Sequence, residues 1–382
     1  MHLKRKICWK IIRPLVIIFL YIKFRYTFKI PKDLPDNCLI LSNHNTDFDP
    51  LFVAVSFRKN LRFVASEHIS RWKNAFKFIN FLFNPIMRQK GTNAASTVKE
   101  ILRTLRGGEN VCMFAEGSRS WNGVTAPVLP STGKLVKSSR CALVTYKLIG
   151  GYFISPLWSE GGTRRGKIHG SVVNIYSADQ IAQMSVDEIN EIIKNDLHED
   201  AYETMKSSPS KYKGKHLAEK LESMLFYCPE CKSIDTLSSL KETVTCSSCG
   251  HSFTYDVFGT LHNTKFSNTK EAFSFVKDRV ESDAKQNVSY TSENAKVITV
   301  VNHAESDIAF GRLSLDNTAF KCSDFSVLIE DIDDMNMHGK NALVFSTKDS
   351  YYEVKLADNS SVLKFYMLFQ VHKYGSVNKF TF

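Results

Sequence analysis

Short apolar runs alternate with amphipathic segments over the first half of the chain. The runs are rich in branched and aromatic residues, which predicts buried strands. They are 38–42, 61–65, 85–89, 111–114, 142–147 and 167–176. Between them, Ile101 and Leu105 recur at helical spacing within 92–106, and Ser185 with Glu188 forms a capping box that opens another helix. This alternation predicts an α/β fold in which one sheet carries helices on both faces.

The pattern changes after residue 206. A polar linker and a short predicted helix occupy 207–225, with the helix over 217–225. Further on, apolar runs separated by turns predict strands, and the spacing over 361–374 is helical. The predicted strands are 297–301, 325–329, 342–345 and 351–354. Several strands followed by one helix predict a β-rich C-terminal domain over 259–382, loosely resembling a pleckstrin-homology-like barrel.

The basic residues gather near the N-terminus. The chain has 382 residues and a net charge of +11, which indicates an anionic partner. Residues 1–30 contain no acid, and their cations flank the apolar run 15–22, which is shorter than the roughly 20 residues that cross a bilayer. No small-residue cleavage site follows, which argues against a secretory signal. We expect 1–30 to be an anchor in the interface of an anionic membrane; the alternative is a basic first helix packed on the domain.

Four of the nine cysteines form two close pairs, over 226–258. They are Cys228, Cys231, Cys246 and Cys249. Two pairs at this spacing suit tetrahedral zinc, and four sulfur ligands leave no open position, so the metal would be structural. The other five cysteines are scattered and do not suggest a disulfide framework. The pattern predicts a zinc ribbon in a reducing, cytoplasmic environment.

Polar residues follow two of the predicted strands directly. His44 and Asp49 lie after 38–42, in the string Asn-His-Asn-Thr-Asp-Phe-Asp-Pro. The second string, Glu116, Gly117, Ser118 and Arg119, lies just after 111–114. Because open α/β sheets build their sites at the carboxyl ends of strands, we expect these groups to meet. A base, an orienting acid and an anion-binding arginine together indicate an enzyme.

These strings resemble the glycerolipid acyltransferase family, to which lysophosphatidic acid acyltransferases belong. That family has a histidine, four residues and an aspartate, then an arginine block matched here by Arg88, then Phe-Pro-Glu-Gly-Thr-Arg-Ser. The resemblance covers about residues 35–170. Ala115 replaces the family's proline, which frees a backbone angle, and Ser118 replaces its threonine. The fourth family block has a proline after the next strand, whereas here none occurs before Pro156.

The resemblance implies a reaction and roles for these residues over a domain at 31–206. A fatty acyl group would pass from a thioester of coenzyme A or acyl carrier protein to a lysophospholipid, expected to be 1-acylglycerol 3-phosphate, to give phosphatidic acid. His44 would be the general base, since an unperturbed histidine titrates near working pH. Arg88 and the string from Glu116 to Arg119 would bind the acceptor, with Arg119 forking onto its phosphate. Ser118 lacks the Gly-x-Ser-x-Gly elbow of a serine nucleophile.

The partner of His44 has two candidates. Asp49 matches the family aspartate and would hold the second ring nitrogen. An aspartate directly before proline is also a good helix N-cap, in which case Asp47 would be the partner.

Three other functions compete with this interpretation. The acceptor could be glycerol 3-phosphate or another lysolipid. The ribbon and the positive charge could indicate a nucleic-acid-binding protein, although the ribbon itself carries few basic residues, which disfavours nucleic acid as a partner. The chain could also be a scaffold with an inactive core, against which the intact set of polar residues argues.

Overall fold

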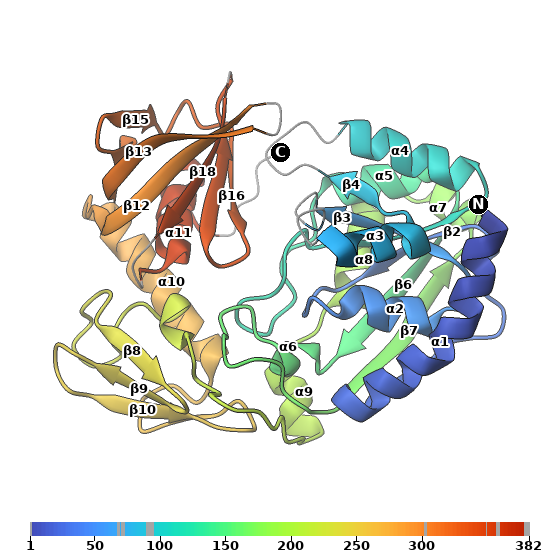
Figure 1. Ribbon diagram of the computed structural model, residues 1–382, viewed down its shortest axis with the longest axis horizontal. Helices are drawn as coiled ribbons and strands as arrows, with labels where there is room; N and C mark the ends of the chain where they lie inside the picture. The colour runs from blue at the N-terminus through green and yellow to red at the C-terminus, as the bar shows by residue number, and fades with distance from the viewer. Residues whose placement is uncertain are drawn as a thin grey trace.

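The computed structural model describes residues 2–66, 69, 73–88, 95–301, 304–348, 350–356 and 360–377. Three sheets organise this part of the chain (Figure 1). In Figure 1 the first sheet and its helices lie at the right, a small yellow sheet lies at the lower left, and an orange-to-red sheet lies above it. The α/β and β-rich parts of the predicted fold are thus both present.

The first sheet has seven strands in the order β1-β7-β6-β2-β5-β3-β4. They are β1 (Tyr26–Lys29), β2 (Cys38–Ser42), β3 (Leu61–Ser66), β4 (Ile86–Arg88), β5 (Asn110–Phe114), β6 (Ala142–Ile149) and β7 (Ile168–Tyr176). Paired strands run parallel except β6 and β7. The six predicted strands are confirmed, apart from residue 89, which lies outside the described residues.

Strand β1 is a correction, because it lies inside the predicted anchor and places the start of the sheet before residue 31. Its four residues form too short a run to stand out in the sequence. Their place is set by tertiary contacts, since the buried Tyr26 hydroxyl bonds to Phe52 O at 3.0 Å and lies 2.9 Å from the Tyr146 hydroxyl.

Helices cover both faces of the first sheet, as predicted. In β2, Cys38 and Ile40 belong to one apolar cluster and Leu39 and Leu41 to another, because successive side chains point to opposite faces. The first face carries α1 (His2–Phe24), α2 (Asp49–Ser56), α3 (Lys73–Phe83), α6 (Gly151–Ile154) and α9 (Ala201–Ser207). The second carries α4 (Ala95–Arg106), α5 (Ser131–Ser139), α7 (Ala178–Gln183) and α8 (Val186–Leu197). The capping box before α8 is present, and residues 92–94 of the predicted α4 segment are not among those described.

The second sheet, which holds the cysteine pairs, is antiparallel. Its strands are β8 (Leu237–Leu240), β9 (Thr243–Cys246), β10 (Ser252–Tyr255) and β11 (Leu261–His262). The helix predicted over 217–225 is wrong, because the chain makes only a 3₁₀ turn at Leu221–Ser223. Lys220, just before it, has a φ of 67°, which an α-helix does not allow. The apolar residues there pack on the core without helical periodicity.

The third sheet is antiparallel, in the order β15-β14-β13-β12-β18-β17-β16. Its strands are β12 (Tyr290–Val301), β13 (Ala304–Leu315), β14 (Ala319–Cys322), β15 (Phe325–Leu328), β16 (Asp334–His338), β17 (Ala342–Ser346) and β18 (Tyr351–Leu356). The predicted C-terminal helix is α11 (Val362–Tyr374), while α10 (Thr269–Lys285) was missed. Its signal was Asn268, whose side chain accepts a bond from Glu271 N–H at 3.0 Å. The pleckstrin-homology likeness stays a prediction.

One apolar core joins the cysteine module, α10 and the third sheet. It contains Val244 from the module, Val276 from α10 and Phe345 from the third sheet. Trp158, from the loop after α6, is buried in the same core. The C-terminal parts are therefore packed against the first sheet's loops as well as against each other.

Candidate active site

A cleft of about 1110 Å³ lies at the carboxyl ends of the first sheet's strands. His44 follows β2, Arg88 ends β4, and Gly117, Ser118 and Arg119 follow β5; all five line this cleft. Residues of β16, α10 and α11 line it from the C-terminal side. Five of the seven predicted catalytic and substrate-binding residues thus meet on one surface, and Asp49 and Glu116 lie behind it.

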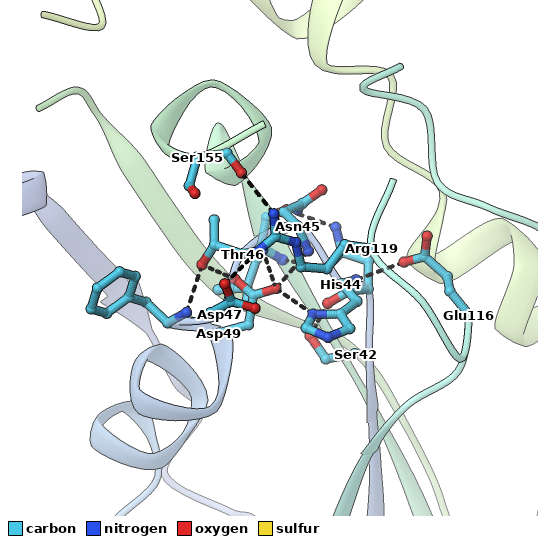
Figure 2. A network of polar contacts seen from close by, with 12 residues as sticks. Ser42, His44, Asn45, Thr46, Asp47, Asp49, Glu116, Arg119 and Ser155 are labelled. Carbon is cyan, nitrogen blue, oxygen red and sulfur yellow. Dashed lines mark hydrogen bonds and ion pairs between the residues drawn. The ribbon is translucent and has the colours of Figure 1, made fainter. Parts of the chain in front are cut away.

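His44 and Asp49 form a hydrogen-bonded pair (Figure 2), with Nδ1 of the ring 2.9 Å from Oδ2 of the carboxylate. Asp49 is fully buried, and its oxygens also accept bonds from the backbone N–H groups of Asn45 and Thr46, at 2.5 and 2.8 Å. A carboxylate held this way fixes the ring and selects the tautomer with the proton on Nδ1. Nε2 is then the atom that can accept a proton.

The structure decides between the two candidate aspartates. Asp49 is the first residue of α2, and the N-cap is Phe48, which makes no side-chain capping bond. Asp47 instead pairs with Arg119, whose Nη1 lies 2.6 Å from Oδ2 of the aspartate. The partner of His44 is therefore Asp49, as the family pattern indicated.

Arg119 is 9% exposed at the wall of the cleft and has donor capacity to spare. Its Nη2 donates to Ser155 O at 3.4 Å, and its buried Nε finds no hydrogen-bond partner among the described residues. Asp47 is mostly exposed, and an ion pair with an exposed partner contributes little. An incoming phosphate can therefore replace the aspartate on the guanidinium at small cost.

The loop from Ala115 to Gly117 is held by its backbone. Gly117 has a φ of 71°, a conformation that favours glycine, and this requirement explains the residue better than close approach of a ligand. Ala115 N–H donates to Ser42 O at 3.2 Å. A proline here has no N–H and could not make that bond. Alanine therefore adds a hydrogen bond to β2 where the proline ring would have restrained the backbone.

Glu116 lies behind the cleft wall, which differs from the predicted substrate contact. Its side chain is 3% exposed, and its two oxygens accept 2.6 Å bonds from the N–H groups of His44 and Ala126. Burial raises the pKa of this carboxyl to about 8. The residue therefore ties the loop after β5 to the backbone of His44.

Glu199 is a site residue that the sequence analysis missed. It lies between α8 and α9, and its buried carboxylate accepts bonds from Asn43 Nδ2 at 3.3 Å, Asn45 Nδ2 at 3.2 Å and Gly150 N–H at 2.9 Å. The two asparagines flank His44, so Glu199 holds both sides of the turn that carries this histidine. No local pattern marks it, because its partners lie about 50 to 150 residues away.

Replacing Glu199 with alanine is expected to lower kcat without raising KM for either substrate. The two asparagine amides lose a buried acceptor, which costs about 1–3 kcal/mol and lets the histidine turn relax. Steady-state kinetics would show the effect. Glu203→Ala, at an exposed position on α9, is the control and should behave as the wild type. A Glu199→Ala protein with wild-type kcat would contradict the positioning role.

The two buried glutamates also predict a pH dependence of stability. Burial raises the pKa of Glu199 to about 7, and the corresponding value for Glu116 is about 8, against an ordinary 4.5. The folded protein keeps these protons where the unfolded chain has lost them, so the free energy of unfolding should fall as pH rises from about 4.5 toward 8. In Glu199→Gln one group no longer titrates, and the fall should be shallower by about 1.4 kcal/mol per pH unit between pH ~5 and ~7. Urea denaturation at each pH gives the free energy of unfolding. If this free energy depended on pH equally in the two proteins, the prediction would be wrong.

The four paired cysteines meet at one point beside the second sheet, with Cys228 and Cys231 before β8, Cys246 at the end of β9 and Cys249 in the turn before β10. Their sulfur atoms all lie within 4.8 Å of one another, with Cys228 and Cys249 3.7 Å apart and Cys231 and Cys246 3.8 Å apart. A tetrahedron with zinc–sulfur bonds of about 2.3 Å has edges of about 3.8 Å, so the spacing fits the metal. Gly250, with a φ of 75°, turns the chain after the last cysteine.

Comparison with known proteins bears on the first part of the chain. Residues 25–158 match the family model described as Acyltransferase, which spans the residues from His44 to Arg119. No curated protein matches. Among solved structures, the 1-acyl-sn-glycerophosphate acyltransferase PlsC from Thermotoga maritima is similar, with a TM-score of 0.43 and 17% identity over 54% of this chain and 81% of that one. Over residues 25–158 the chain is therefore similar to the family described as Acyltransferase.

Proposed function

We propose that the protein transfers a fatty acyl group from a thioester to the hydroxyl of a lysophospholipid, with 1-acylglycerol 3-phosphate as acceptor and phosphatidic acid as product. The observation that carries the proposal is the placement of His44, held from behind by Asp49, and of Arg119 on the wall of one cleft. A base for the hydroxyl and a cation for the phosphate are the two groups that this acceptor needs.

The reaction needs no nucleophile from the protein. His44 Nε2 takes the proton of the acceptor hydroxyl while its oxygen attacks the thioester carbonyl, and Asp49 stabilises the imidazolium that forms. When the tetrahedral intermediate collapses, the carbon–sulfur bond breaks and the thiolate takes the proton from the ring. The products are an ester and a free thiol of coenzyme A or acyl carrier protein.

Arg119→Ala is expected to raise KM for the acceptor while leaving KM for the donor unchanged. Loss of a charged hydrogen bond to phosphate costs about 1.5–3 kcal/mol, which corresponds to about a 10- to 150-fold change in binding. Steady-state kinetics with the acceptor and the donor varied in turn would measure the two KM values separately. Arg103→Ala, in an exposed pair on α4, is the matched control. A raised donor KM would instead place the thioester's phosphates on Arg119.

The N-terminal helix supports a location at the membrane surface. Ile7, Ile11, Leu15, Ile18 and Ile22 are all more than half exposed and recur at helical spacing along α1. Phe78 and Phe81 of the neighbouring α3 are exposed as well, and Trp9 packs on Phe83 between the two helices.

No helix among the described residues is both long and apolar enough to cross a bilayer. An apolar stripe flanked by cations suits a helix that lies in the interface of an anionic membrane. We place the protein on the cytoplasmic face, as a peripheral or monotopic protein that meets its lipid acceptor there.

The cysteine cluster is proposed to hold a structural zinc ion. Four thiolates complete the preferred coordination and leave no position for substrate, so the metal would supply stability to the module and take no part in the reaction.

Acyl transfer to radiolabelled lysophosphatidic acid, with long-chain acyl coenzyme A and acyl carrier protein thioesters offered separately, tests the function. Labelled phosphatidic acid with one donor is the expected result and identifies that donor. If product formed only with glycerol 3-phosphate or another lysolipid, the acceptor assignment would be wrong. If no acyl group were transferred to any acceptor, the assignment of the protein as an acyltransferase would be wrong.

A further inference from the structure

The C-terminal part of the chain forms one wall of the catalytic cleft. Leu363, Tyr366, Met367 and Gln370 of α11 line the cleft and recur at i, i+3, i+4 and i+7, so they share one face of the helix. Leu363 and Met367 also belong to the core that contains Phe345, so α11 lies between that core and the cleft.

Partly exposed apolar side chains complete this wall. They are Leu157 from the loop after α6, Phe273 from α10, Met337 from β16 and Tyr366 from α11. Each belongs to the periphery of the same core and faces the space that holds His44.

The wall is fixed to the catalytic part by polar contacts. Lys340, in the turn after β16, is 14% exposed, and its Nζ donates to Trp158 O at 3.2 Å and Ser159 O at 3.0 Å. Its ammonium also pairs with Glu160 at 3.2 Å. Tyr152 of α6 and Thr269 of α10 add a buried hydroxyl contact at 2.8 Å. These contacts therefore fix the C-terminal wall of the cleft relative to the first sheet.

Arg119 stands at the edge of this wall. It bonds to Ser155 O, while Lys340 bonds to carbonyls three and four residues later in the same loop. Burial lowers the pKa of Lys340; the nearby Glu160 opposes this shift, and the charge of Arg119 adds to it. By contrast, α1, whose residues also reach the cleft, lies at the opposite side of the view from α11 (Figure 1). A phosphate on Arg119 would thus sit beside the part of the wall that Leu157 and Met337 form.

We propose that the wall formed by Leu157, Phe273, Met337 and Tyr366 binds the acyl chain of the lysophospholipid acceptor. This inference rests on the proposed function. In the acceptor, one glycerol joins the phosphate to the acyl chain. When the phosphate binds Arg119, the acyl chain therefore begins next to this wall. The cleft also exceeds the roughly 300–1,000 Å³ typical of sites for drug-sized ligands, which leaves room for a lipid chain. The C-terminal domain is then part of the acceptor site and sets its chain-length preference.

Substitutions on the wall test the inference through binding. Met337→Trp narrows the cleft, and Tyr366→Ala removes contact area. Isothermal titration calorimetry with the full chain, in the absence of donor, would measure the binding of two lysophosphatidic acids, one with a dodecanoyl and one with an octadecanoyl chain. Glycerol 3-phosphate would be titrated as well, to measure binding of the headgroup alone. Both variants are expected to weaken octadecanoyl binding about tenfold, since 1.4 kcal/mol of apolar contact is a factor of ten. Headgroup binding should not change.

The controls separate the possible outcomes. Ile308→Trp, on an exposed face of β13 away from the cleft, should bind every ligand as the wild type does. Melting curves confirm the folding of each variant, and two variants of opposite volume guard against a folding defect in one. Equal chain-length dependence in wild type and both variants would overturn the inference. A changed preference for the acyl-chain length of the donor thioester would also overturn the inference, because the wall would then bind the acyl chain of the donor. Chain-length effects on binding in a protein that transfers no acyl group would sink the proposed function and leave the lipid site standing.

Discussion

Alanine at His44 is expected to lower kcat for acyl transfer by about 10²–10⁴-fold, the usual contribution of a positioned general base. The ring sits 2.9 Å from Asp49 at the cleft wall and stacks on Phe114, with ring centroids 4.3 Å apart. No other described histidine lines the cleft. Without the imidazole, the acceptor hydroxyl must lose its proton to water during attack. The loss should appear in kcat, since the phosphate contact proposed for Arg119 is untouched.

The measurement is steady-state acyl transfer by purified proteins at saturating donor, together with thermal melting. His262→Ala is a matched control, because that ring lies on β11 of the second sheet and is more than half exposed. Asp49→Asn should fall between wild type and His44→Ala, because an amide oxygen can still accept from Nδ1 but cannot offset the imidazolium charge. A folded His44→Ala protein with wild-type kcat would remove the histidine from the mechanism.

Removal of zinc is expected to have the largest effect on stability. Structural zinc contributes about 10–16 kcal/mol of apparent binding free energy in small modules, and that energy is folding energy. Cys228→Ser takes away one ligand, and its side chain is buried in the core that the module shares with α10 and the third sheet. Loss of the metal should therefore lower the melting temperature of the whole C-terminal part.

Metal analysis and melting of the purified chain check this. The wild type should contain one zinc per chain, and Cys228→Ser should contain less and melt earlier. Cys8→Ser, at a cysteine of α1 outside the cluster, should retain the zinc. A chelator should reproduce the effect of the mutation in the wild type, because Cys231 and Cys249 are exposed. A metal-free wild type that melts no earlier than the zinc-loaded protein would show that the cluster has no structural metal.

The elements that follow from local pattern were predictable. Strand β2 begins and ends as the apolar run indicates, and the capping box placed the start of α8. The spacing of cysteine pairs indicated a cluster, and its sulfurs do converge. In each case the determining interactions are between near neighbours in the chain, or between two short motifs of known geometry. Sequence period and motif spacing therefore carry the information.

Other features depend on the path of the chain in space. Glu199 accepts a bond from Asn43, 156 residues away, and only the folded backbone brings them together. Two aspartates close in sequence took different partners, because α2 begins at Asp49 and leaves Asp47 facing Arg119.

The sequence by itself determined six of the seven strands of the first sheet, the polar strings that follow two of them, and the cysteine cluster. Only the tertiary structure decided which carboxylates are buried and which surface of the C-terminal domain faces His44. Such contacts join segments whose sequences carry no mark of one another, since packing between distant segments depends on the shape of the whole fold.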